Sequence, residues 1–412
     1  MVHHSVKYVR HGFTTSDLST THGSSRDCQN CLSERPISHF YIRSQMRSII
    51  ACTFFVCLAA VAHAGDTFVV NCNPLSVQRA DPIVTPGRPA PHVHSIVGGN
   101  AFNRTMLGID FAENATGTTC DKKLDHSNYW VPSLYHKNQN GTYSLVPWSG
   151  TAIYYQNRAC DYNATLDGQV YCPQGTYAAA FPRGLRMLAG DPSKRSFNSS
   201  DPTDQAVQMM CMSKDYSKEY NGFPTEVCNE HIRAEVYFPS CWDGVHIDTP
   251  NHKDHMAYPA ARFDGGLCPK SHPIALISIF FEFFFDTSSI TDLGNFYLSN
   301  GDNTGYSFHG DFINGWTNLT ALGEAHRLCV SSDNCPINTL GAAPGHNHPE
   351  DQPLLYTAIY EENIGLNGPV TSLPGQVIFA PTPISTAVRG GSDGLRPTLF
   401  AMVAVLLACM FL

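Results

Sequence analysis

The cysteines constrain the fold of this chain more than any other feature of its sequence. The 412 residues contain 15 cysteines, an odd number that a closed set of disulfides cannot use up. Five of them lie in two terminal regions that have the features of processing signals. Ten remain between residues 65 and 391, with no C-x-x-C pair, which favours five disulfides over a zinc site. These ten are Cys72, Cys120, Cys160, Cys172, Cys211, Cys228, Cys241, Cys268, Cys329 and Cys335.

The N-terminal region has the pattern of a secretory signal peptide. Residues 46–48, Met-Arg-Ser, precede an apolar run over residues 49–62, and Ala62-His63-Ala64 fits the cleavage site of a signal peptidase. We therefore expect residues 46–64 to be removed from a secreted protein. Residues 1–45 have no apolar periodicity, and we interpret them as an upstream gene-model extension or a leader.

The C-terminal region has the pattern of a lipid-anchor signal. Residues 397–412 are almost entirely apolar, and the small residues 390–394 precede them after a short polar spacer. About 15 apolar residues are fewer than the roughly 20 that a membrane-spanning helix needs. We expect residues 392–412 to be a glycosylphosphatidylinositol signal, with a tail-anchored helix as the alternative, and residues 376–391 to be a Pro/Thr/Ser stalk. The expected anchor makes a membrane surface one partner of the protein.

Charge and sequons describe the kind of surface that the mature chain carries. Residues 65–391 include 19 basic and 31 acidic residues, a net charge of −12, so no basic surplus is available to neutralise the phosphates of a nucleic acid. Six N-x-S/T sequons predict N-glycosylation. Together these features indicate an extracellular, surface-anchored glycoprotein. The sequons begin at Asn103, Asn114, Asn140, Asn163, Asn198 and Asn318.

Residues 65–375 read as one β-rich domain. Short β-branched and aromatic segments recur between Gly- and Pro-containing turns, and no long amphipathic helix stands out. The most apolar run, residues 274–285, predicts a central strand buried on both faces. We expect an all-β, sandwich-like single domain with few short helices and long loops stapled by disulfides, of which Cys160–Cys172 and Cys329–Cys335 are the local candidates. The other predicted strands cover residues 67–70, 92–97, 142–146, 151–155, 234–238, 354–360 and 377–380.

Three short motifs pair a histidine with a second histidine or an aspartate two residues later. They are His92-Val-His94, His246-Ile-Asp248 and His309-Gly-Asp311. In a strand, residues two apart project from the same face, so each pair can meet one ion or one substrate group. Imidazole and carboxylate are ligands of zinc, copper and iron, which favours a divalent transition metal as a cofactor. With 13 histidines in residues 65–391, chance pairs that serve only hydrogen bonding are the alternative. The expected metal ligands are His92, His94, His246 and His309.

The densest group of chemically active side chains lies within residues 243–255, where six Asp and His residues fall in 13 positions. The neighbouring Trp242 and Tyr258, together with the more distant Trp316, offer aromatic faces for binding a sugar ring. Glycoside hydrolysis requires two carboxylates that flank the scissile bond. The alternative is a polar loop whose Asp and His side chains cap turns. The candidate catalytic residues are Asp243, Asp248, Asp311 and His255, with Glu282 and Asp302 as further carboxylates.

Several longer motifs occur in a characteristic order. They are Asp81-Pro-Ile-Val-Thr-Pro-Gly87, Ser127-Asn-Tyr-Trp-Val-Pro132, Phe238-Pro-Ser-Cys-Trp-Asp-Gly244 and Ser307-Phe-His-Gly-Asp-Phe312. Over about residues 66–335 the chain resembles the fungal secreted family known as domain of unknown function 1996. The resemblance implies a single domain, a fungal source and an extracellular or cell-wall setting. It assigns no catalytic role to any residue.

The leading hypothesis from the sequence is a carbohydrate-active wall protein in which the His and Asp residues form one metal-dependent site. Wall polysaccharide is then the expected partner. Two other classes of function stay open. One is a non-catalytic wall protein that binds glycan or metal, and the other is a structural glycoprotein.

Overall fold

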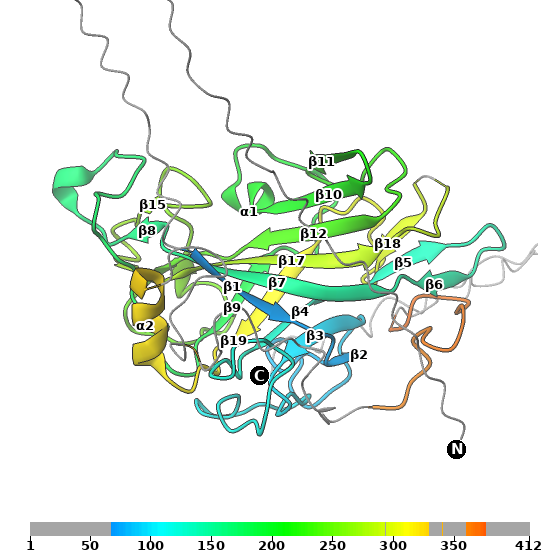
Figure 1. The fold of residues 1–412 in the computed structure, drawn as a ribbon, viewed down its shortest axis with the longest axis horizontal. Helices are drawn as coiled ribbons and strands as arrows, with labels where there is room; N and C mark the ends of the chain where they lie inside the picture. Colours follow the sequence, from blue (N-terminus) through cyan, green and yellow to red (C-terminus); the bar gives the residue numbers. More distant parts are fainter. Residues whose placement is uncertain (1–66, 293, 329–339, 341–359, 376–412) are drawn as a thin grey trace, which may run out of the picture. The chain divides into compact units, whose positions relative to one another are not determined.

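The structure is a computed structural model that describes residues 67–292, 294–328, 340 and 360–375. The regular structure of these residues is almost entirely antiparallel strands, with two short α-helices and one 3-10 turn (Figure 1). This confirms the predicted all-β class. Both predicted processing segments and the predicted stalk lie outside the described residues, as do the Cys329–Cys335 candidate pair, the strand expected over 377–380 and nearly all of that over 354–360. The helical elements are α1 (Pro202–Gln205), α2 (Leu319–Leu328) and the 3-10 turn η1 (Ala164–Leu166).

A six-stranded sheet contains four of the eight segments that were predicted as strands. Its order is β1-β7-β17-β12-β10-β11, and all neighbours are antiparallel. The apolar run over 274–285 is not one strand, because the backbone N–H groups of Leu276 and Ile277 donate to Ser240 and Ala179 instead of to a neighbouring strand of the sheet. The remainder of that run forms β17, which is central in the sheet as predicted. The strands are β1 (Thr67–Cys72), β7 (Trp148–Gln156), β17 (Ser278–Asp286), β12 (His231–Tyr237), β10 (Val207–Ser213) and β11 (Tyr216–Tyr220).

A five-stranded sheet packs face to face against the six-stranded one. Its order is β2-β3-β4-β19-β9, again antiparallel throughout. The Tyr129 ring of this sheet lies 5.5 Å from the Phe281 ring of the other, and side chains of both sheets form one core cluster. This is the face-to-face packing of a β-sandwich. The strands are β2 (Ser76–Gln78), β3 (His94–Gly98), β4 (Asn128–Pro132), β19 (His309–Ile313) and β9 (Arg186–Gly190).

The core between the sheets is rich in aromatic rings whose polar ends are satisfied. Trp316 is 0% exposed, and its indole Nε1 donates a hydrogen bond to the Tyr155 hydroxyl at 2.8 Å. That hydroxyl lies 2.5 Å from the hydroxyl of Tyr129, which donates to Asp125. Burying an apolar side chain of this size contributes about 1.5–3 kcal/mol, provided that its polar atoms find partners. Trp316 is therefore a core residue with no face open to a sugar ring.

Four disulfides fasten long loops to these sheets. Cys160 is joined to Cys172, as the sequence favoured, and the other bridges are Cys72–Cys120, Cys211–Cys228 and Cys241–Cys268. Three small sheets complete the described strands. They contain β14 (Met256–Ala257), β13 (Cys241–Trp242) and β16 (Ile274–Ala275); β15 (Gly266–Leu267) and β8 (Ala159–Cys160); and β18 (Phe296–Leu298), β5 (Leu134–Lys137) and β6 (Tyr143–Leu145).

The face of the five-stranded sheet that points away from the core is covered by long loops. A second apolar cluster joins loop residues such as Phe102 and Met106 to Ile96 and Trp130 of the sheet. The chain packs closely at the edge of this covered face. A Cβ at Gly98, whose φ is +107°, would lie 1.9 Å from the carbonyl oxygen of Ser127, so only glycine fits there. This covered outer face carries the site described below.

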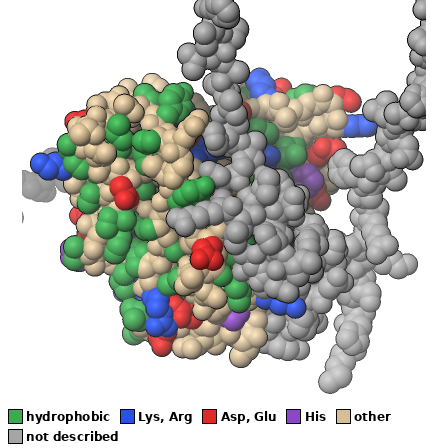
Figure 2. Space-filling view, turned by 60° about the vertical axis from the view of Figure 1, so that its left-hand side comes forward, with side chains coloured by type: hydrophobic (Ala, Val, Ile, Leu, Met, Phe, Trp, Pro, Cys, Tyr) green, Lys and Arg blue, Asp and Glu red, His purple; other side chains and the backbone are tan. Residues whose placement is uncertain are grey.

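Charged side chains are scattered on the face of the molecule drawn in Figure 2, where acidic and basic groups lie among hydrophobic and neutral polar ones. Among the described residues, no helix has the length and apolar character needed to cross a bilayer.

Candidate metal centre

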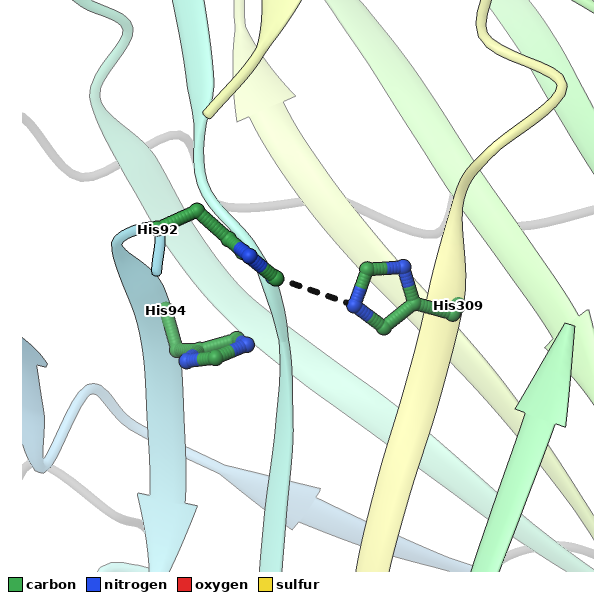
Figure 3. Close-up of side chains that lie close together, drawn as sticks. All are labelled: His92, His94 and His309. Atoms are coloured by element: carbon green, nitrogen blue, oxygen red, sulfur yellow. Dashed lines mark hydrogen bonds between the residues drawn. The ribbon is translucent and has the colours of Figure 1, made fainter. Parts of the chain in front are cut away.

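Three histidines from distant parts of the sequence meet on the outer face of the five-stranded sheet (Figure 3). His94 begins β3, His92 lies two residues before it, and His309 begins β19. One ring nitrogen of each lies within 4.8 Å of those of the other two, and all three side chains are buried. The rings of His92 and His94 are 4.4 Å apart and those of His92 and His309 are 5.1 Å apart, measured between centroids. The sequence predicted these three residues as metal ligands, and the structure brings them together.

The register of the sheet explains why they converge. β4 lies between β3 and β19, and it carries Pro132 opposite His94 and Trp130 opposite Asp311. Because β4 and β19 are antiparallel, His309 is level with Pro132, so His94 and His309 share one row of the outer face. Two-residue spacing along a strand keeps a side chain on that face, as the sequence motifs required.

Hydrogen bonds to backbone carbonyls fix which nitrogen of two rings carries the proton. Nδ1 of His94 lies 3.1 Å from the carbonyl oxygen of Ala80, and Nδ1 of His309 lies 2.7 Å from that of Ser307. A carbonyl only accepts, so each Nδ1 donates and each neutral ring presents a bare lone pair at Nε2. Backbone carbonyls orient metal-binding histidines in this same way.

The Nε2 lone pairs of His94 and His309 have different surroundings. Nε2 of His309 lies 3.1 Å from Nε2 of His92, which donates to it. Nε2 of His94 is buried and has no hydrogen-bond partner among the described residues. A buried acceptor without a partner costs about 1–3 kcal/mol, and most buried polar atoms avoid this cost. The unpartnered lone pair of His94 is the feature that a metal ion would satisfy.

Burial also holds the three rings in the neutral form that binds metals. It lowers the pKa of His94 to about 3 and that of His309 to about 4. Burial, followed by repulsion from the other two rings, holds the pKa of His92 well below its ordinary value. The site is therefore three neutral imidazoles at physiological pH, which suits zinc, copper, nickel, cobalt or iron.

Asp311 lies on the same face of β19 as His309 and is 3% exposed. Its Oδ2 has no hydrogen-bond partner among the described residues. Burial, reinforced by the nearby Asp81, holds the pKa of Asp311 well above its usual range. Asp81 is also buried, but its carboxylate accepts from the backbone N–H groups of Ile83 and Val84 in a turn. Of the predicted carboxylates, Asp311 is the one that shares a sheet face with the histidines.

The remaining predicted ligand, His246, belongs to a different group. It is an exposed loop residue whose Nδ1 lies 2.6 Å from Oδ2 of Asp243. Burial opposes the shift, but hydrogen bonds from the side chain and backbone N–H of His246 hold the pKa of Asp243 below its usual value. Among the described residues, the group of histidines whose ligand nitrogens lie close together consists of His92, His94 and His309, and His246 is not part of it.

Other predicted residues of the 243–255 loop also make local contacts. Asp248 lies 2.7 Å from Nδ1 of His252, the one described non-glycine residue with a positive φ, +58°. His255 is fully buried, and its Nε2 lies 2.7 Å from the carbonyl oxygen of Arg186 on β9. These contacts match the alternative interpretation of a polar loop held by turns. The loop nevertheless touches the site, since Nζ of Lys253 donates to the carbonyl of Gly190, which pairs with His309.

Two predicted aromatic residues lie at the edge of this loop. Nε1 of Trp242 donates to the carbonyl of His246, and the hydroxyl of Tyr258 donates to that of Tyr237. Both rings are partly exposed. The other two carboxylate candidates lie elsewhere: Asp302 accepts from turn N–H groups, and Glu282 lies on the six-stranded sheet.

Sequence reasoning missed three groups that belong to the neighbourhood of the triad. Two are backbone carbonyls, of Ala80 and Ser307, which no side-chain pattern can reveal. The third is Trp130, whose buried Nε1 has no partner among the described residues. Its place in the Ser127–Pro132 motif was noted, but only the register with β19 places it beside Asp311.

Comparison with known proteins gives one match. The sequence model of a family described as "Domain of unknown function (DUF1996)" matches residues 81–316. That stretch contains all three histidines, Trp130 and Asp311. No curated protein and no solved structure matches the chain.

Proposed function

Because the chain belongs to the DUF1996 family, and the matched stretch contains the whole triad, we propose that this domain binds a divalent transition metal through His92, His94 and His309. The single observation that carries the proposal is the buried, unpartnered Nε2 of His94 in a triad that can place one ring nitrogen of each histidine within 4.8 Å of the other two. Most buried polar atoms have a hydrogen-bond partner, so a lone pair without a donor at the meeting point of three imidazoles favours a bound ion over packing alone.

The choice of metal follows from the ligands. Three neutral imidazoles suit Zn²⁺, Cu²⁺ and neighbouring first-row ions, while Mg²⁺ and Ca²⁺ prefer oxygen ligands. The carbonyls of Ala80 and Ser307 supply the outer contacts that orient two of the rings. We assign zinc or copper as the ions of choice.

In the same proposal the domain is a secreted glycoprotein of the fungal cell surface. The signal-peptide pattern, the lipid-anchor pattern and the six sequons support this setting. Four disulfides are compatible with it, because such bonds persist in oxidising compartments. Wall polysaccharide is the proposed partner, and the partly exposed Trp242 and Tyr258 are the rings that remain available for sugar stacking.

Two roles for the metal are distinguished by its surroundings. A metal-dependent enzyme acting on polysaccharide is supported by Asp311, a buried carboxylate on the same sheet face. A non-catalytic metal-binding wall protein is favoured by the burial of the triad, since His92 and His309 are each only 6% exposed and His94 is 0% exposed.

The test of metal binding uses the chain secreted from a eukaryotic host, deglycosylated and analysed by elemental mass spectrometry after dialysis against zinc or copper. We expect about one ion per chain in the wild type and none in His94→Ala. An absence of metal from the folded wild type would contradict the proposal.

The test of the polysaccharide role incubates the metal-loaded and the metal-stripped protein with β-1,3-glucan, chitin and cellulose. New soluble products that appear only with the loaded protein would support the enzyme. Co-sedimentation with a glycan, without products and regardless of metal, would favour the binder.

A further inference from the structure

Two more buried polar atoms, which lie in one row of the outer face of the five-stranded sheet, have no hydrogen-bond partner among the described residues. They are the indole Nε1 of Trp130, a donor, and the carboxylate Oδ2 of Asp311, an acceptor. Trp130 is fully buried and Asp311 is 3% exposed. Leaving such an atom unsatisfied is unfavourable, and more so for a charged group. A donor and an acceptor that are both unsatisfied on one face indicate a ligand that serves both.

The register places these two atoms beside the triad. Trp130 on β4 lies directly opposite Asp311 on β19, so their side chains are neighbours on the same face. The next row lies two residues further along each strand. It holds His309 on β19, Pro132 on β4 and His94 on β3. Rows two residues apart are separated by about 7 Å. The donor–acceptor pair and two of the three ligands, His94 and His309, therefore occupy adjacent rows, while His92 precedes β3.

A metal held by three imidazoles would have one further coordination position for a ligand. Metal–nitrogen and metal–oxygen bonds are each about 2 Å long, so a fourth ligand on this side spans much of the distance between the rows. A water molecule has the matching hydrogen-bonding groups. Its oxygen binds the metal and accepts from the Trp130 indole, and one of its O–H groups donates to Oδ2 of Asp311.

We propose that the metal centre is open, with a small ligand in its fourth position held between Trp130 Nε1–H and the Asp311 carboxylate. The ligand is water at rest and is replaced by a small anion or by a hydroxyl oxygen of the substrate. This inference rests on the proposed metal function and goes further, because open sites are the catalytic kind and structural sites are closed by four protein ligands. Trp130 and Asp311 act through the metal's ligand, so they are positioning residues.

The experiment loads the full chain with Co²⁺ and follows its visible absorption during titration with azide, an anion that accepts hydrogen bonds and donates none. In the wild type we expect azide to replace water and to change the spectrum. Trp130→Phe removes a donor to azide and should weaken its binding about tenfold. Asp311→Asn replaces an oxygen that accepts from the bound water with an amide that donates to azide, and should tighten azide binding about tenfold. Trp148→Phe, a tryptophan that stacks on Phe283 in the six-stranded sheet, is the matched control and should leave the affinity unchanged.

The opposite signs separate this role from a merely structural one, which would weaken azide binding in both variants or in neither. An unchanged cobalt spectrum in azide-treated wild type would overturn the open site, and wild-type azide affinity in both variants would overturn the role of Trp130 and Asp311, in each case with cobalt binding intact. Failure of the folded wild type to bind cobalt would overturn the metal function itself. Circular dichroism establishes that each variant is folded, and the wild-type titration decides the question even where a variant is not.

Discussion

At the scale of single residues, the centre depends on where three protons lie. Ala80 and Ser307 hold the protons of His94 and His309 on Nδ1, which leaves both Nε2 atoms free of hydrogen. His92 donates from Nε2 to His309 when no ion is bound. Binding a metal at Nε2 of His92 therefore requires its proton to leave that atom for Nδ1 or for solvent. His92 is the ligand whose protonation changes on loading.

The first prediction compares two histidines that the sequence motifs did not distinguish. His309→Ala removes a buried ligand and should abolish metal uptake together with the rise in melting temperature that metal produces, because a bound ligand stabilises only the folded state. His246→Ala changes an exposed loop residue bonded to Asp243 and should keep both. Differential scanning calorimetry with and without zinc measures the two effects. Equal loss in both variants would contradict the assignment of the triad.

Of the histidines that the sequence proposed as ligands, the structure brings three together and leaves His246 apart. His309 and Asp311 lie on one face because both belong to β19, whereas His94 begins β3 and His92 precedes that strand. His246 and Asp248 have the same spacing but lie in a loop, where the two-residue rule does not apply. Which strands become neighbours is a property of the long-range pairing, which spacing alone does not specify.

At the scale of elements, β19 links the site to the core. His309 and Asp311 face outward, and Gly310 between them faces the other sheet. A Cβ at Gly310 would lie 2.8 Å from the side chain of Val236 and 3.0 Å from the ring of Phe238. The strand thus sits as close to the six-stranded sheet as the absence of a side chain allows.

The second prediction follows from this contact. Gly310→Ala should push β19 outward, destabilise the fold by about 1–3 kcal/mol as overpacking does, and weaken metal binding by displacing His309. Urea unfolding and competition with a zinc chelator measure the two changes. Gly323→Ala in α2 is the control, because its nearest contact would be an ordinary 3.5 Å and alanine favours helices. Gly310→Ala with wild-type stability would contradict the packing described.

The third prediction concerns the central strands of the six-stranded sheet. Glu235 on β12 lies opposite Glu282 on β17, both are buried, and Arg233 contacts each of them. Burial raises the pKa of Glu235 to about 7, against the opposing effect of Arg233, and burial also raises that of Glu282.

A carboxyl group whose pKa is raised by folding stabilises the protein fully below its unfolded pKa, near 4.5, and this contribution is lost as the pH rises through about 7. The wild type should therefore lose stability relative to Glu235→Gln between pH 4.5 and 7, by on the order of 1–3 kcal/mol. Urea midpoints across this range measure the difference. Parallel stability curves for the two proteins would contradict it. The variant is needed for comparison because the lowered pKa values of the triad make the stability of the fold rise with pH, which is the opposite direction.

At the scale of the whole molecule, the fold class followed from alternation and turn residues, since β-branched segments between glycines and prolines have few other stable arrangements. The exact start of β17 did not follow, because Leu276 and Ile277 are as apolar as the strand but bond elsewhere. The disulfide pairing was also open except for Cys160–Cys172, since pairing depends on which loops meet.

The fourth prediction ranks two of these disulfides. Cys72–Cys120 closes a separation of 48 residues and Cys160–Cys172 one of 12. In the chain-entropy account the longer loop restricts the unfolded chain more, so replacing both cysteines by alanine should cost about 1 kcal/mol more for the first pair. Guanidinium unfolding of the two double variants measures this. Equal losses would show that strain or contacts outweigh the chain entropy.

Metal binding by the three histidines is tested most directly by X-ray absorption at the zinc edge of the zinc-loaded, full-length secreted chain. We predict about three imidazole nitrogens at 2.0–2.1 Å from the zinc and one further light ligand, with the imidazole signal reduced in His94→Ala. A wild-type protein that takes up no zinc, or whose zinc is surrounded by carboxylate oxygens alone, would contradict it.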